Sequence, residues 1–362
     1  IDIGGPSMVR AAAKNYTHVS VVTNPEMYDA VAEELEQNDG CLSQETHFAL
    51  ALEAFRHTAH YDTVIAQYLA GIASEHIKGP ERLTLEFVKR QELRYGENPQ
   101  QTAAFYVEEG LGEPCVGTAE QVGGPELSFN NILDINAGIE LVKEFDRPAA
   151  VLLKHTNPCG AGTADSLRDA YEKAYFGDPL SAFGCAVVLN RPLDVHTALA
   201  IAEVRATLGG GRSAPYFVES LVAPELDPEA LALLRQKTDW AERTRFLKTG
   251  PLNWRSVDEA AKDMRRVTGG LLVQDRNLLG FERDGLRVAT EAAPTEEQMA
   301  DLEFAWLCCK HVKSNAIVLA RDEALVGVGA GQMSRVDATV IALRKAGDRA
   351  RGAALASDAF FP

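Results

Sequence analysis

The sequence predicts an α/β fold built from more than one domain. Two short apolar runs, Ala149–Leu153 and Ala316–Ala320, are bounded by polar or glycine-containing turns, which favours buried strands. Asp165 or Ser166 can cap a helix after the first run, and Thr295 can cap a long helix before the second. The 362 residues exceed what one hydrophobic core usually serves, so we expect two or three domains.

The N-terminal part predicts a strand end followed mainly by helices. Ile1–Ile3 resembles the last residues of a strand, Gly4-Gly5 makes a turn, and Ser7 can cap a helix. This arrangement can form an anion-binding site, although any α/β protein contains such turns. The remaining elements are a strand at His18–Thr23 and helices at Pro25–Gln37 and Ser43–Ala73.

A polar stretch containing glycine and proline, Glu75–Arg82, predicts a linker, with the second domain beginning shortly after it. Periodicity then predicts strands at Leu83–Val88, Cys185–Leu189, Phe217–Ala223 and Leu271–Gln274. It also predicts helices at Ile132–Phe145, His196–Leu208, Glu229–Gln236, Glu296–Asn315 and Val336–Gly347, the last capped by Ser334.

Two titratable side chains, Lys154 and His155, directly follow the strand Ala149–Leu153. Asn157-Pro158 and Gly160 then predict a turn, so the unit is interpreted as strand, reactive loop and helix. Ligands of open α/β sheets bind outside the carboxyl ends of the strands. We therefore expect chemistry at Lys154 and His155.

Composition excludes several classes of function. The formal net charge of −16 argues against nucleic-acid or anionic-membrane partners. No membrane span or signal peptide is evident, and the six cysteines lack C-x-x-C spacing, so we expect reduced thiols, no metal site and a cytoplasmic protein. His57 and His60 lie one helical turn apart, but no third ligand accompanies them.

Glycines at Gly327, Gly329 and Gly331 suggest a dinucleotide site, which would make the protein a dehydrogenase. The G-x-G-x-x-G spacing fails because position 332 is glutamine. What remains is a glycine-rich turn at a helix N-terminus with Arg335 in the first turn, which is better suited to bind a monophosphate than a pyrophosphate.

Eight ordered motifs resemble one family, the bifunctional AICAR transformylase/IMP cyclohydrolases: LRYGENPQQ, LSFNNILDINA, VLLKHTNPCGAG, DPLSAFG, GGLLVQDR, VKSNAIV, GAGQMSR and SDAFFP. The opening IDIGGPSMVRAAAKNY resembles part of the family's cyclohydrolase site. The resemblance implies a methylglyoxal-synthase-like Rossmann-type remainder over 1–78. It also implies a transformylase region over 79–362, made of two cytidine-deaminase-like α/β/α units at roughly 79–255 and 256–362, the second incomplete.

The family's transformylase moves a formyl group from 10-formyltetrahydrofolate to the amine of AICAR. The resemblance makes His155 the general base, a task that suits the near-neutral pKa of histidine. Lys154 would stabilise the oxyanion and keep the imidazole neutral, and Asn315 would orient the formyl group. The nucleotide contacts implied are Arg94, Tyr95, Asn131, Arg335 and Phe360.

The same resemblance assigns Lys14, Asp2 and Gly4 to the cyclohydrolase, which closes FAICAR to IMP. We expect a chain cut at both ends, which would leave this second activity absent from the chain alone. The family's transformylase site forms across a homodimer interface, so a homodimer is implied. His155-Thr156-Asn157 lacks the glutamate of a zinc deaminase, so no zinc is implied.

Two questions stay open at this stage. Gly209–Tyr216 is interpreted as an inserted surface loop of unknown role. A non-catalytic nucleotide-binding scaffold is the alternative to an enzyme, because a fragment can bind without turnover.

Overall fold

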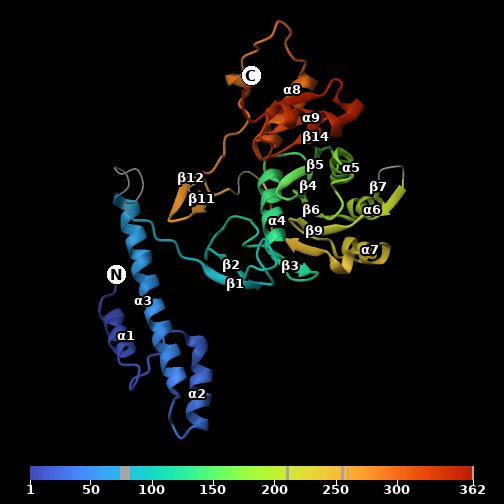
Figure 1. The fold of residues 1–362 in the computed structure, drawn as a ribbon. Coiled ribbons are helices and arrows are strands. Elements are labelled where there is room, and N and C mark those ends of the chain that lie inside the picture. The colour runs from blue at the N-terminus through green and yellow to red at the C-terminus, as the bar shows by residue number, and fades with distance from the viewer. Residues whose placement is uncertain (74–81, 209–211, 254–256, 260, 361–362) are drawn as a thin grey trace. The chain divides into compact units, whose positions relative to one another are not determined.

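The computed structural model describes residues 1–362 apart from 74–81, 209–211, 254–256, 260 and 361–362 (Figure 1). The chain divides into two compact units, Ile1–Glu86 and Phe87–Pro362. The expected linker and the expected boundary at 78/79 fall almost wholly in 74–81, outside the described residues. Each unit is described by itself.

Every element of secondary structure assigned in the described residues of unit 1 is a helix. It contains α1 (Gly4–Lys14), a 3-10 turn (Pro25–Met27), α2 (Tyr28–Gln37) and α3 (Gln44–Ala73). α1 packs on α3 through a small core of Ala13, Ala51 and Ala54.

Three predictions for unit 1 are wrong. Ile1–Ile3 is not a strand, and α1 begins at Gly4, where the Ser7 hydroxyl donates to the Ile3 carbonyl instead of capping a later start. His18–Thr23 forms no strand. A β-branched run becomes a strand only where a neighbouring strand accepts its backbone hydrogen bonds, and the described part of this unit provides none.

Unit 2 is organised on a nine-stranded mixed sheet with the order β15-β13-β14-β5-β4-β6-β9-β10-β3 (Figure 1). Its strands are β3 (Glu120–Gly123), β4 (Ala149–Lys154), β5 (Asn157–Thr163), β6 (Cys185–Leu189), β9 (Val218–Ala223), β10 (Arg245–Lys248), β13 (Ile317–Arg321), β14 (Ala324–Gly329) and β15 (Ala354–Ser357). Three two-stranded hairpins stand apart from it: β1 (Val88–Leu93) with β2 (Ala103–Val107), β7 (Arg205–Leu208) with β8 (Arg212–Pro215), and β11 (Lys262–Val267) with β12 (Gly270–Asp275).

Helices cover both faces of the sheet. α4 (Phe129–Val142) and α8 (Glu296–Lys310) share one core with alternate strand residues such as Val151 and Val318. The strand residues between them, such as Leu152 and Ile317, pack against the opposite layer. That layer consists of α5 (Leu167–Gly177), α6 (Val195–Glu203), α7 (Pro228–Lys237) and α9 (Arg335–Ala346). Unit 2 is therefore an α/β/α sandwich, as expected of an α/β fold.

The sandwich contains an internal repeat. The series α4, β4–β5, α5, β6 has the same order as α8, β13–β14, α9, β15. Ser128 and Thr295 open α4 and α8 with capping boxes, and Ser166 and Ser334 cap α5 and α9. β5 and β14 join the two halves within the sheet, where Ala324 pairs antiparallel with Gly162.

The predicted reactive loop is instead a strand, which is the main correction in unit 2. Asn157–Thr163 forms β5 and pairs antiparallel with β4, so the turn contains only His155 and Thr156. Glycine in β5 lets α5 approach closely: a Cβ at Gly160 would lie 1.9 Å from the Ala174 carbonyl oxygen.

Three other boundaries differ from those predicted. The strand expected at 83–88 begins only at Val88. The helix expected at 196–208 ends at Glu203, and the one expected at 296–315 ends at Lys310.

Candidate active site

The hairpin tip between β4 and β5 presents the predicted catalytic pair. His155 and Thr156 have φ of 52° and 62°, and the His155 side chain is exposed. The Lys154 ammonium donates to the carbonyl oxygens of Phe183 (2.7 Å) and Gly184 (3.1 Å). An ammonium has three protons, so one remains for a ligand.

The second half of the repeat supplies the opposite side of this edge. The segment Lys313–Asn315 precedes β13, and the turn Gly331–Met333 follows β14. They are joined by backbone hydrogen bonds from Gly331 to Lys313 (2.7 Å) and from Asn315 to Gln332 (3.1 Å). The Lys313 amide also donates to Asn157 Oδ1 at 3.1 Å, which fastens this segment to the His155 hairpin. The structure thus brings the hairpin of Lys154 and His155 to the segment of Asn315.

Arg335 is held by neighbouring side chains at this edge. Its guanidinium donates to Asn315 Oδ1 (2.7 Å), Ser357 Oγ (2.8 Å) and the Asp358 carboxylate, and its side chain is 14% exposed. Asn315 Nδ2 in turn donates to the Gln332 carbonyl at 2.8 Å. Burial raises the pKa of Asp358, but hydrogen bonds from Ser314 and Arg335 outweigh this and lower it below its usual value. Arg335 therefore fixes the orientation of the Asn315 amide.

A cavity of about 260 Å³ opens between the two halves at this edge. Both repeats contribute to its wall, and it carries the ammonium groups of Lys154 and Lys345. Lys345 pairs with Asp178 at 2.8 Å. The remaining lining residues are Asn157, Pro158, Cys159, Ser181, Val328, Ala330, Gln332 and Ile341.

The other residues predicted for the transformylase have separate environments. Asn131 is 6% exposed and completes the capping box of α4, while its amide donates to Glu219 at 3.3 Å. Arg94 is exposed and Tyr95 half-buried, directly after β1. Phe360 is 84% exposed. Their nucleotide contacts remain predictions.

The residues predicted for the cyclohydrolase lie at the two ends of α1. Asp2 precedes the helix and accepts a hydrogen bond from the Gly5 amide at 3.1 Å, and Gly4 is the first helical residue. Lys14 is the last. A rise of 1.5 Å per residue places Lys14 about 15 Å from Gly4 along the helix axis. α1 alone does not bring these groups together.

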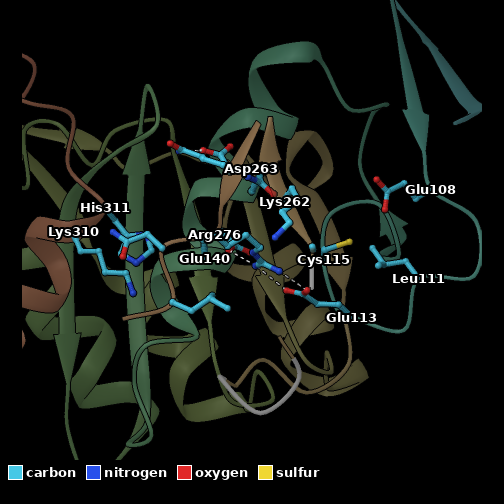
Figure 2. Close-up of a pocket in the computed structure, with 15 residues that line it drawn as sticks. Glu108, Leu111, Glu113, Cys115, Glu140, Lys262, Asp263, Arg276, Lys310 and His311 are labelled. Atoms are coloured by element: carbon cyan, nitrogen blue, oxygen red, sulfur yellow. Dashed lines mark hydrogen bonds and ion pairs between the residues drawn. The ribbon is translucent and has the colours of Figure 1, made fainter. Parts of the chain in front are cut away.

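A second, charged cavity of about 390 Å³ was not foreseen from the sequence (Figure 2). Figure 2 shows Arg276 in its wall, where it donates to Glu113 (2.7 and 3.1 Å) and to Glu140 (2.7 Å). Glu113 also pairs with Lys143, and these two side chains are only 6% and 3% exposed. The charged groups of this cluster pair with one another, so it presents no free group for catalysis, and removing one partner would leave a buried charge uncompensated.

Metal and membrane features complete the description. Within the described residues no group of three or more histidine, cysteine or acidic side chains could hold a metal ion. No described helix is long and apolar enough to cross a membrane. All six cysteines are free thiols, four of them buried, as predicted.

The fold and this edge define an α/β/α sandwich protein with a polar site where two repeated halves meet. A family model described as AICARFT/IMPCHase bienzyme matches residues 12–345. Proteins named bifunctional purine biosynthesis protein PurH are 47% identical in Thermoanaerobacter sp. (strain X514), 47% in Ruminiclostridium cellulolyticum and 46% in Halalkalibacterium halodurans. These matches cover 100% of this chain but 66%, 67% and 66% of the relatives, so the chain spans about two thirds of their length. The chain belongs to the AICARFT/IMPCHase bienzyme family, as its motifs predicted.

Proposed function

We propose that unit 2 transfers a formyl group from 10-formyltetrahydrofolate to AICAR. The observation that carries the proposal is the hydrogen bond from the Lys313 amide to Asn157, which holds the hairpin of His155 against the segment of Asn315. The expected base, cation and amide therefore come from two halves of the repeat but share one edge of the sheet. Membership of the family supports the same substrates.

The chemistry follows from these groups. The AICAR amine attacks the formyl carbon, and His155 accepts its proton as the new C–N bond forms. The remaining N–H of the Lys154 ammonium would donate a hydrogen bond to the oxyanion of the tetrahedral intermediate, while Asn315 orients the formyl oxygen. The tetrahedral intermediate then collapses, the bond from carbon to N10 of the folate breaks, and N10 takes the proton that His155 accepted, which leaves the imidazole neutral again.

We further propose the finer architecture and the second activity. The repeat of helix, hairpin, helix and strand supports two cytidine-deaminase-like units within 79–362. Unit 1 would be the remainder of a methylglyoxal-synthase-like domain, and the full-length protein would also close FAICAR to IMP. The free cysteines support a reducing, cytosolic compartment.

We also propose a homodimer whose interface adjoins the site. Four apolar side chains repeat at intervals of three or four residues along α9 and the turn before it: Met333, Val336, Val340 and Leu343. All are exposed, which is typical of a helix face that packs on a partner. Sedimentation of the full-length protein tests this state, and a monomer at micromolar concentration would contradict it.

A single-turnover assay of the full-length protein with AICAR and formylated folate tests the function. Formation of FAICAR in one burst is expected. AICAR binding without any product would favour the non-catalytic scaffold, and nicotinamide binding detected by fluorescence would favour the dehydrogenase alternative.

For Lys154→Arg we expect kcat for formyl transfer to fall by about 10²-fold, the usual effect of losing one donor to an oxyanion. The ammonium donates to two carbonyl oxygens and lies close to the backbone of Gly184, where a Cβ would be 3.2 Å away, and a planar guanidinium cannot reproduce the contacts of this compact group. Lys173→Arg is the matched control, because Lys173 also donates to two carbonyl oxygens, those of Thr163 and Asp322. Equal activity of the two variants would mean that Lys154 contributes only its positive charge and no directed hydrogen bond.

For Arg335→Ala we expect KM for AICAR to rise about ten- to hundredfold, with a smaller loss for the unphosphorylated riboside, if the guanidinium contacts the phosphate. Steady-state kinetics with both substrates measure this. Arg344→Ala, an exposed arginine on the same helix, is the control. A fall in kcat that is equal for nucleotide and riboside would mean instead that Arg335 acts through Asn315.

A further inference from the structure

We infer that Asp134 is a positioning residue for His155: its carboxylate fixes the hairpin tip from which the imidazole projects. The inference rests on the proposed formyl transfer. The side chain comes from α4, on one face of the sheet, and reaches the turn between β4 and β5. Its Oδ1 accepts a hydrogen bond from the Thr156 amide at 2.6 Å.

The turn needs such support because its residues are unsuited to it. Two consecutive left-handed residues favour Asn-Gly, and a β-branched threonine at φ 62° is an outlier. A residue strained in this way persists only where its surroundings fix it. The side-chain hydrogen bonds from Thr156 Oγ1 (2.7 Å) and Asn157 Nδ2 (3.0 Å) to the His155 carbonyl are local, and the Lys313 amide reaches Asn157, just after the tip. Asp134 is the tie from the tip to a helix.

The helix that carries the carboxylate is anchored in the core. The neighbours of Asp134 on α4, Ile135 and Ile139, are fully buried in the core shared with α8. Partial burial raises the pKa of Asp134, opposed by the backbone amides of Thr156 and His155 and by the charges of His155 and Lys154. The charged side chains that act on the Asp134 carboxylate are therefore those of His155 and Lys154. Asp134 thus links the hairpin tip, and with it the exposed imidazole, to a helix that is packed in the core.

The second half of the repeat contains the same device without a catalytic side chain. Asp301 lies at the equivalent position of α8 and accepts a hydrogen bond from the Glu323 amide at 2.7 Å. Its turn, Asp322-Glu323, also has positive φ, of 56° and 53°. Glu323 pairs with Arg147 at the opposite edge of the sheet, away from Asn315. Replacing Asp301 therefore measures what a hydrogen bond from the helix aspartate to the hairpin turn contributes to stability, without an effect on a catalytic side chain.

The test compares alanine variants of the two aspartates in the full-length protein. Both are expected to lose similar thermal stability. Asp134→Ala should lower kcat for formyl transfer about ten- to hundredfold with KM for AICAR within about threefold, because small misplacement of a catalytic group is costly. Asp301→Ala should keep kcat within about twofold. Equal effects of the two variants on kcat would overturn the inference.

Two further variants separate hydrogen bonding from charge and from misfolding. Asp134→Asn keeps an acceptor oxygen and should retain most of kcat, whereas an asparagine variant as slow as the alanine variant would overturn the positioning role in favour of charge. Adding Thr156→Gly to Asp134→Ala should restore kcat several-fold, because glycine adopts positive φ without strain. Absence of any rescue would also count against the inference.

Failure of the proposed function can be distinguished from failure of this inference. A wild-type protein that forms no FAICAR would refute the function. Hydrogen exchange of the Thr156 amide would still report on the tie: faster exchange in Asp134→Ala than in Asp301→Ala supports it, and unchanged exchange overturns it.

Discussion

Replacing His155 by alanine or asparagine is expected to lower formyl-transfer turnover about 10²–10⁴-fold while AICAR affinity changes by no more than a few-fold. The imidazole is exposed at the hairpin tip, so its loss removes a proton acceptor and little packing. Asparagine is the more informative substitution, because it tolerates the left-handed conformation of residue 155 better than alanine.

Turnover with AICAR and equilibrium binding of AICAR are the two measurements for His155. His196→Ala, an exposed histidine on α6, is the control and should behave as the wild type. An asparagine variant that retains most of the wild-type rate would remove His155 from the proton transfer. A variant that loses AICAR affinity in proportion to rate would make His155 a binding residue.

Glu113→Ala is expected to lower the free energy of unfolding by about 3–5 kcal/mol, the range for breaking a buried ion pair from one side. Buried Lys143 would keep only Glu140, at 3.5 Å, as an acidic partner, and Arg276 would lose its two bonds to Glu113. Urea or thermal unfolding measures the loss. Glu108→Ala, an exposed glutamate of the same cavity, should change stability little.

The same carboxylate predicts a pH dependence of stability. Burial raises the pKa of Glu113, but hydrogen bonds from Arg276 and Lys143 outweigh this and lower it from 4.5 to about 2. Its stabilising contribution is therefore complete above the unfolded value and is lost as pH falls from there toward 2. Glu113→Ala should flatten unfolding stability across this acidic range. An unchanged slope would contradict the lowered pKa.

Features encoded locally could be predicted from the sequence. The caps Ser166, Thr295 and Ser334 lie next to the helices they open, and the apolar runs at Ala149–Leu153 and Ala316–Ala320 are strands. A capping residue bonds within three positions, and an apolar run is its own signal of burial.

Features that depend on distant partners could not be predicted. The His155-Thr156 turn has no glycine or asparagine to mark a hairpin, whereas Asn157-Pro158 and Gly160 predict a loop. The Arg276–Glu113 pair joins residues 163 positions apart, and neither has a local pattern that marks it as buried. The tie from Asp134 to the hairpin and the grip of Arg335 on Asn315 likewise appear only in three dimensions. Lys154, His155 and Arg335 are marked in the sequence by their places after a strand and at a helix N-terminus, the family resemblance implies the other site residues, and only the structure shows the environment of each.

The backbone pairing between Ala324 and Gly162 also bears on the order of assembly during synthesis. The first repeat leaves the ribosome before the second, so the glycine-containing edge of β5 stays unpaired until β14 has been synthesised. Each hairpin closes between segments close in sequence, whereas the bond between Lys313 and Asn157 spans 156 residues and forms only when the halves dock. Helices and strands should therefore mature first, and catalytic competence should arise last, as a product of docking.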